Sequence, residues 1–218
     1  MKDAGIHEAI SILRDLVKKW QTPAVTIVSQ REGDPFKVLI SCILSLRTRD
    51  KTTGEASARL FALADTPQRM VLLTRELIEK TIYPVGFYRN KATQILDICG
   101  VLLEKHAGRV PDEIDDLLRF KGVGRKTANL VVTLGFGKPG ICVDTHVHRI
   151  CNRWGYVRTK SPEETEIVLR AKLPREYWLI INDLLVTFGQ NQCLPISPLC
   201  SICPLFNACN RVGVVKSR

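Results

Sequence analysis

A lysine, an aspartate and four clustered cysteines are the residues of this sequence whose types and spacing could do chemistry. The lysine, Lys126, stands in the stretch FKGVGRKTAN (residues 120–129), which places two glycines and three cations between two apolar runs. Gly122 and Gly124 can adopt backbone angles closed to other residues, so N–H groups near a helix N-terminus can approach a phosphate oxygen. Three side chains add positive charge at the same place: Lys121, Arg125 and Lys126. We expect a phosphate-binding turn; the alternative is an ordinary tight helical connection.

Lys126 has a second possible role because of its place in the first turn of the helix that follows the glycines. The positive end of the helix dipole penalises a cation there. Together with the neighbouring cations, this placement should lower the pKa of the ammonium group from its usual value of about 10.4. More of the neutral amine, the nucleophilic form, would then be present. The alternative is a solvated lysine that only binds phosphate.

Asp144, in VDTHVHRI, directly precedes a helix with apolar periodicity. Aspartate is a preferred N-cap residue, so a purely structural role is one reading of this position. A capping carboxylate also stays ionised, which suits it to stabilise positive charge that develops on a sugar during bond cleavage. His146 and His148 are two apart and point to different faces of a helix, so we interpret them as surface or packing residues.

The four clustered cysteines lie within 17 residues, in a C-x6-C-x2-C-x5-C pattern: Cys193, Cys200, Cys203 and Cys209. Prolines between them favour a loop, in which four thiolates can converge on one [4Fe-4S] cluster or on a structural Zn²⁺. Disulfides or chance clustering are the alternative. The other four are scattered in or beside apolar helices and are expected to be small core residues: Cys42, Cys99, Cys142 and Cys151.

The composition sets the class of protein and of partner. The chain has 218 residues, of which 45% are hydrophobic and 25% charged, as in a folded globular protein. Its 32 Lys and Arg against 22 Asp and Glu give a net charge of +10, which favours a polyanionic partner such as nucleic acid. A basic but otherwise ordinary enzyme is the alternative. We expect no membrane span, no signal or transit peptide, and a reducing cytosolic setting.

The elements that must position these residues are predicted to be helices throughout, since apolar residues recur at spacings of three and four. One stripe contains Ile6, Ile10, Leu13, Val17 and Trp20, and residues 36–46 form a helix that is apolar nearly all round. Thr66-Pro67 and Ser161-Pro162 predict helix starts, the second with a capping box to Glu164. Helices over 112–120 and 125–136 would flank the glycine turn, and Gly189 is expected to end another helix.

The run from Phe120 to Arg153, followed by the cysteine pattern, resembles the endonuclease III family of DNA glycosylases, in the helix-hairpin-helix superfamily. The resemblance covers roughly Ile27 to Cys209. It implies an all-α fold of two helical lobes that flank a DNA-binding cleft. One lobe would be a six-helix barrel over 28–138, with the helix-hairpin-helix at about 112–136. The other would be a discontinuous iron–sulfur domain made of 1–27 and 139–218, with its cluster loop at 193–209.

The resemblance also implies roles for the matching positions. Lys126 would attack the sugar C1′, expel the damaged base and form a Schiff base, after which β-elimination cuts the strand on the 3′ side. Asp144 would stabilise oxocarbenium-like charge and assist proton transfers. The cysteine spacing implies a [4Fe-4S] cluster in place of zinc. Arg211, just beyond the cluster loop, would contact the DNA backbone with Lys121, Gly122, Gly124 and Arg125 of the hairpin.

Three positions depart from the family's common pattern. Phe87, in PVGFYRNKA, stands where the family typically carries an intercalating leucine, and a core residue at a helix start is the alternative. Arg47, in LSLRTRD, stands where many members have a glutamine that fills the vacated stack. Arginine has no amide carbonyl, so the preference for the opposite base is expected to differ. Lys121 replaces a common proline, which adds charge to the turn.

The sequence therefore predicts a bifunctional DNA glycosylase and AP lyase that removes oxidised pyrimidines from double-stranded DNA. We expect a monomer in a prokaryotic cytoplasm, associated with the nucleoid. Two alternatives stay open. One is a monofunctional glycosylase acting on mismatched uracil, thymine or adenine, although such relatives generally carry another residue at the lysine position. The other is a non-catalytic, cluster-containing DNA-binding protein.

Overall fold

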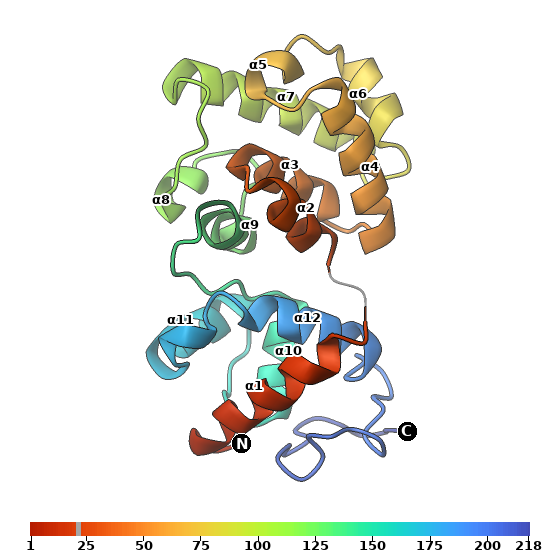
Figure 1. Cartoon of the computed structure of the whole chain (residues 1–218), viewed down its shortest axis with the longest axis vertical. Helices are drawn as coiled ribbons and strands as arrows, with labels where there is room; N and C mark the ends of the chain where they lie inside the picture. Colours follow the sequence, from red (N-terminus) through yellow and green to blue (C-terminus); the bar gives the residue numbers. More distant parts are fainter. Residues whose placement is uncertain (21–22) are drawn as a thin grey trace. The chain divides into compact units, whose positions relative to one another are not determined.

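The structure is a computed structural model that describes residues 1–20 and 23–218, and every regular element in these two ranges is a helix (Figure 1). The chain divides into two compact units. One is made of Met1–Pro23 and Ile141–Arg218, and the other of Ala24–Gly140. The prediction of an all-α protein is thereby confirmed. The predicted domain bounds, 28–138 and 1–27 with 139–218, remain a prediction, and residues 21 and 22 lie outside the described residues.

The continuous unit contains eight α-helices and one π-helical turn within the described residues. They are α2 (Ala24–Glu32), α3 (Pro35–Ser45), α4 (Asp50–Leu63), α5 (Pro67–Met70), α6 (Arg75–Ile82), α7 (Tyr88–Lys105), α8 (Ile114–Leu117), α9 (Arg125–Leu130) and η1 (Val131–Gly135). The discontinuous unit contains α1 (Ala4–Val17), α10 (Thr145–Arg153), α11 (Pro162–Lys172), the 3₁₀ turn η2 (Arg175–Tyr177) and α12 (Ile181–Asn191). No helix in the described ranges is long and apolar enough to cross a bilayer.

Helix α3 is the core of the continuous unit, as its apolar sequence predicts. It contacts α2, α4, α7, α9 and η1, and every residue from Val38 to Leu44 is buried. Its start is fixed by Asp34, whose side chain accepts a hydrogen bond from the Phe36 N–H at 2.8 Å, and by Pro35 in the first turn. A helix buried on all sides gives a rigid base for the loop that follows it.

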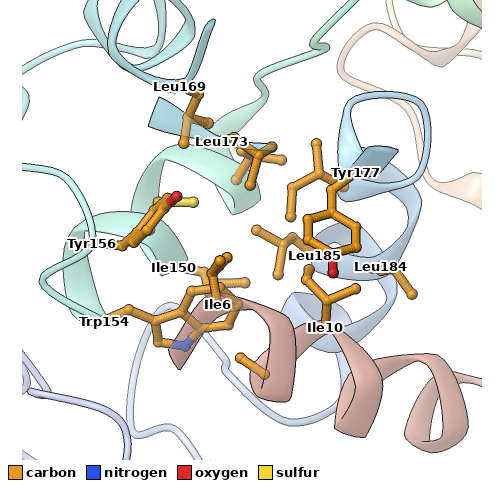
Figure 2. Close-up of a cluster of buried hydrophobic side chains, with 14 of the residues drawn as sticks. Ile6, Ile10, Ile150, Trp154, Tyr156, Leu169, Leu173, Tyr177, Leu184 and Leu185 are labelled. Carbon is orange, nitrogen blue, oxygen red and sulfur yellow. The ribbon is translucent and has the colours of Figure 1, made fainter. Parts of the chain in front are cut away.

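The core of the discontinuous unit brings the N-terminal helix onto the helices that follow residue 144. Ile6, Ile10 and Leu13 are buried, and Val17 and Trp20 are partly buried beside them, so the predicted stripe is confirmed. Figure 2 shows Ile6 and Ile10 of α1 packed with side chains of α10, α11 and α12. Burial of this apolar surface ties the first residues of the chain to the segment that carries Asp144.

Two predicted helix starts are confirmed, and one detail is corrected. The Thr66 hydroxyl accepts from the Arg69 N–H at 3.3 Å, and the Ser161 hydroxyl accepts from the Glu164 N–H at 3.2 Å. The capping box is incomplete, because the Glu164 carboxylate accepts from the Lys160 N–H at 2.8 Å and not from Ser161. The Glu164 side chain thus reaches one residue beyond Ser161, where it still satisfies a backbone donor at the helix start.

The glycine predicted to end a helix does not do so. Gly189 lies inside α12 and is buried there. A Cβ atom at this position would collide with the His146 ring and would lie 2.9 Å from Arg149 Nη2. Glycine therefore serves the close approach of α12 to α10, and the cost of glycine in a helix is offset by that packing.

The helices that flank the glycine turn are shorter and less regular than predicted. Only residues 114–117 of the expected 112–120 helix are α-helical, and α9 ends at Leu130, where the chain widens into the π turn η1. The Thr133 hydroxyl donates to Asn129 O at 2.8 Å and lies 3.3 Å from Leu130 O, next to the π turn. Bonds from a threonine hydroxyl to earlier carbonyls loosen the regular α pattern.

Candidate active site and cluster loop

The glycine hairpin between α8 and α9 uses its two glycines differently. Gly122 has a φ of +78°, a left-handed conformation that favours glycine. A Cβ atom there would also collide with the Gln94 amide, so glycine is required for two reasons. Gly124 has an extended φ of −95°, which any residue adopts. The expectation that both glycines supply unusual backbone angles is therefore wrong for Gly124. A Cβ atom there would meet no atom within 4 Å outside its chain neighbours, so the space beside this residue is open.

The hairpin is held from behind by two contacts. Val123 is buried, and its N–H donates to Phe120 O at 3.0 Å. Gln94, on α7, donates from its amide nitrogen to Lys121 O at 2.9 Å. Sequence reasoning missed Gln94, since a polar residue in an amphipathic helix gives no signal of a contact with a turn 27 residues later. The turn is thus braced while its exposed residues, among them Lys121, face away from the core.

Lys126 is the second residue of α9, and its side chain is half-buried. Arg125 before it is also half-buried, and no side chain caps the N-terminus of α9. Burial raises the pKa of the nearby Cys42 thiol, on α3, to about 12, and the charge of Lys126 lowers it in part. Cys42 therefore stays a neutral thiol near neutral pH and does not compete with the lysine as a nucleophile.

Asp144 belongs to the discontinuous unit and is the N-cap of α10, as predicted. Its Oδ1 accepts hydrogen bonds from the N–H groups of His146 and Val147, at 2.8 and 2.9 Å. The residue is 8% exposed, so the carboxylate is held in one place with little access to bulk water. A fixed, hydrogen-bonded carboxylate is the arrangement that stabilises a developing cation without having to reorganise.

Arg149, which sequence reasoning did not single out, connects α10 to the start of the cysteine loop. Its Nη2 donates to Cys193 O at 2.9 Å and lies 3.3 Å from Gly189 O and 3.2 Å from His146 Nδ1. The pKa of the Arg149 guanidinium is lowered, mainly by burial and in part by the charge of Arg153, while Cys193 and Asp144 act in the opposite direction. The histidines are packing residues, as expected: His146 contacts Arg149, and His148 Nδ1 lies 2.7 Å from the Thr165 hydroxyl.

The four clustered cysteines line a single pocket, together with aromatic and basic side chains of the same unit. The lining includes Trp154, Phe188, Phe206, Arg153 and Arg211. Burial raises the pKa of the Cys203 thiol to about 11, with smaller contributions from the other three thiols, which lie close by. The other four cysteines are buried in the two cores, as predicted.

The four thiols surround one pocket and receive polar contacts. Within the described residues, no group of three or more His, Cys, Asp or Glu side chains is drawn together as around a bound metal ion. Arg153 Nη1 lies 3.4 Å from Cys193 Sγ, and the Arg211 N–H donates to Cys209 Sγ at 3.4 Å. Such contacts stabilise the thiolate form that binds metals.

Arg47 and Phe87, which lie 40 positions apart in the sequence, are brought together in the continuous unit. The Arg47 guanidinium carbon lies 5.6 Å from the centre of the Phe87 ring. Phe87 is 59% exposed, so the alternative of a core residue at a helix start is excluded. Arg211, in the other unit, folds back on the cysteine loop: its Nη1 donates to Phe206 O at 2.7 Å, and its guanidinium carbon lies 4.1 Å from the Phe206 ring centre.

Comparison with known proteins places this geometry in a family. Residues 40–175 match the model of the HhH-GPD superfamily of base excision DNA repair proteins. Endonuclease III of Thermotoga maritima is 47% identical over 198 residues, which cover 91% of this chain and 90% of that protein. The chain belongs to the endonuclease III family. Endonuclease III of Escherichia coli is 37% identical over 177 residues, which cover 81% of this chain and 84% of that protein.

Solved structures agree with the endonuclease III assignment. A non-covalent endonuclease III–DNA complex has a TM-score of 0.86 at 34% identity and covers 97% of this chain and 96% of its own. A trapped covalent endonuclease III–DNA intermediate has a TM-score of 0.84 at 33% identity and covers 97% of both chains. A thermostable thymine-DNA glycosylase, at 22% identity and a TM-score of 0.75, shares the fold, so the fold alone does not select a substrate.

Proposed function

We propose that this member of the endonuclease III family is a bifunctional DNA N-glycosylase and AP lyase that removes oxidised pyrimidines from double-stranded DNA. The observation that carries the proposal is Lys126, a half-buried lysine in the first turn of α9, two residues after the glycine that precedes this helix. High identity to endonuclease III over 91% of the chain supports the same activity.

Lys126 is the proposed nucleophile in both steps. Its neutral amine attacks C1′, the glycosidic bond breaks, and the base leaves with the bonding electrons and takes up a proton. Opening of the sugar ring gives a protonated Schiff base between Nζ and C1′. Removal of a C2′ proton then forms a carbon–carbon double bond, and the C3′–O bond breaks, which cuts the strand on the 3′ side.

Asp144 is proposed to stabilise the positive charge that develops on the sugar as the base leaves. Its two hydrogen bonds to backbone N–H groups fix the carboxylate before substrate arrives. A preorganised charge of this kind acts in the transition state and costs no reorganisation during the reaction. We also assign it assistance in the proton transfers of the later steps.

DNA contacts are proposed at three places. The hairpin residues Gly122, Gly124, Lys121 and Arg125 would bind a phosphate through backbone N–H groups and positive charge. Phe87 and Arg47 would fill the space left when the damaged nucleotide leaves the duplex, because extrusion opens a gap in the stack. Arg211 would contact the DNA backbone from beside the cysteine loop.

Cys193, Cys200, Cys203 and Cys209 are proposed to hold a [4Fe-4S] cluster. When bound, the cluster would cross-link four points of a loop that has no regular secondary structure and would fix the position of Arg211. Arg153 supports the loop from α10, since its guanidinium donates to Leu194 O and Pro195 O, both at 2.6 Å. The chain's own contacts therefore order the segment that carries the ligands.

The cluster assignment predicts the metal content of the purified protein. We expect about four iron and four sulfide per chain, as for a [4Fe-4S] centre. The Cys203→Ala protein should lose both and unfold at a lower temperature, whereas Cys99→Ala, at a buried cysteine of the other unit, should keep both. Metal analysis and acid-labile sulfide assays measure this. About one zinc per chain without sulfide would contradict the assignment.

The proposed function is tested with a panel of duplexes that contain thymine glycol, uracil, G·T and A·G pairs or an abasic site. We expect excision of the oxidised pyrimidine and strand cutting at the abasic site in the presence of a metal chelator, because Schiff-base chemistry needs no Mg²⁺. Excision of mismatched bases without strand cutting would favour a monofunctional glycosylase. Binding without excision or cutting would favour a non-catalytic DNA-binding protein. We also propose that the protein is a monomer in the cytoplasm of a prokaryote, associated with the nucleoid.

A further inference from the structure

Lys91 is a buried lysine whose ammonium group is surrounded by oxygens from a single segment. It lies in the first turn of α7 and is 5% exposed. Its Nζ donates to Leu44 O at 2.9 Å, to Leu46 O at 2.5 Å and to the Thr48 hydroxyl at 3.2 Å. An ammonium group has three donors, so these three oxygens can use all of them.

The three oxygens belong to the end of α3 and the loop that follows it. The Thr48 N–H, which would continue the helix by bonding Leu44 O, donates to Ser45 O instead, at 3.1 Å. Leu44 O thus lies at a helix C-terminus, where carbonyls lack partners and the helix dipole favours a cation. Lys91 caps α3 from a different helix, 47 residues later in the chain.

The capped loop carries Arg47 in a strained conformation. Arg47 has a φ of 52°, in the left-handed region that a non-glycine residue rarely adopts. Lys91 binds Leu46 on one side of Arg47 and Thr48 on the other. These two bonds fix the loop on both sides of the strained residue, which is the support that such a conformation requires.

The same contacts hold the loop that carries Phe87. The Thr48 hydroxyl accepts from the Gly86 N–H at 3.1 Å, and a Cβ atom on Gly86 would lie 2.5 Å from Arg47 O. Phe87 follows, also with a positive φ, of 58°, and the Lys91 N–H donates to Phe87 O at 3.0 Å. Lys91 therefore bonds to the segments on both sides of the Arg47–Phe87 contact.

A lysine at this place has an energetic cost. Burial lowers the pKa of the Lys91 ammonium to about 8, and its contacts named above are neutral oxygens. Burying a charge is unfavourable unless hydrogen bonds compensate it. A glycine or asparagine at the end of α3 would cap the helix without that cost, so the lysine calls for a role beyond ending the helix.

We propose that Lys91 is a positioning residue that fixes Arg47 and Phe87 as one rigid wedge for the DNA base stack. The wedge would enter the duplex when the damaged nucleotide leaves, and Lys91 itself would touch neither DNA nor the reacting atoms. The inference rests on the proposed function, because it assigns the Arg47–Phe87 pair a task in nucleotide extrusion. It does not concern the chemistry at Lys126.

The test uses two substrates with the same abasic strand. One is an intact duplex; in the other, the complementary strand has a gap of several nucleotides opposite the abasic site, so no opposite base or stack needs a wedge. Lys91→Met keeps the side-chain length and removes the donors. We expect it to cut the intact duplex about 10- to 100-fold more slowly, the scale of a 1 Å misplacement, and the gapped substrate at the wild-type rate. Lys105→Met, at an exposed lysine of the same helix, should change neither rate.

Two further variants disturb the Arg47–Phe87 wedge without changing Lys91. Thr48→Ala removes the shared hydroxyl, and Gly86→Ala forces the two loops apart; both should repeat the selective loss on the intact duplex. Combining Lys91→Met with Phe87→Ala should add no further loss, because both changes act on one unit. Equal losses on both substrates, or additive losses in the double variant, would overturn the inference. A wild-type protein that cuts neither substrate would instead overturn the proposed function.

Discussion

The Lys126→Gln protein is expected to bind abasic duplex and to cut it slower than the wild type by on the order of 10³-fold or more, because loss of a nucleophile removes the covalent route. Glutamine keeps much of the side-chain length, so the substitution should change the local packing little. Single-turnover cleavage of a labelled abasic duplex measures the rate. A binding titration at the same salt concentration measures the affinity.

The matched control for this prediction is Lys105→Gln. Lys105 lies in the last turn of α7 and is exposed, so its loss removes the same charge without touching the hairpin. It should cut at the wild-type rate. If Lys126→Gln cuts as fast as this control, another amine forms the Schiff base, and the hairpin serves DNA binding alone.

The Asp144→Asn protein is expected to excise thymine glycol slower by on the order of 10²- to 10³-fold, the scale of losing one preorganised electrostatic contact in a transition state. Asparagine also caps helices well, so the Oδ1 contacts to the His146 and Val147 N–H groups can persist and stability should change little. Asp144→Ala should show a slow reaction and, in addition, a loss of about 1 kcal/mol in the free energy of unfolding.

The Asp144→Asn and Asp144→Ala proteins together distinguish the effect of the carboxylate charge from the effect of the helix cap. Excision rates and denaturant unfolding curves are both needed, since the first reports the transition state and the second reports the cap. Wild-type excision by Asp144→Asn, combined with a destabilised Asp144→Ala, would leave Asp144 as a helix cap only. A slow Asp144→Asn protein with unchanged stability would assign it to the chemistry.

Local sequence patterns predicted much of the fold and the site because the physical causes are local. The apolar residues from Val38 to Leu44 predicted a helix buried on all sides, and Thr66-Pro67 and Asp144 predicted helix starts that the structure contains. The glycine turn was predicted from residue types, since Gly122 needs a left-handed φ. Interactions between residues within about four positions of each other can be predicted from the local sequence pattern.

The parts that could not be predicted depend on contacts between distant segments. Gln94 binds the carbonyl of Lys121, 27 residues later, and Lys91 binds the carbonyl of Leu44, 47 residues earlier. The residue types glutamine and lysine do not indicate these partners. Local rules predict a helix end at Gly189, whereas close packing against His146 holds this glycine inside α12.

The measurement that tests the central claim most directly is peptide mapping of the borohydride-reduced complex with abasic duplex. Reduction converts a Schiff base to a stable secondary amine, so the attached sugar fragment marks the nucleophile. After nuclease and protease digestion, mass spectrometry should find the added mass on Lys126 and on no other lysine. A trapped complex whose added mass lies on a different residue, or the absence of any trapped complex, would contradict the account.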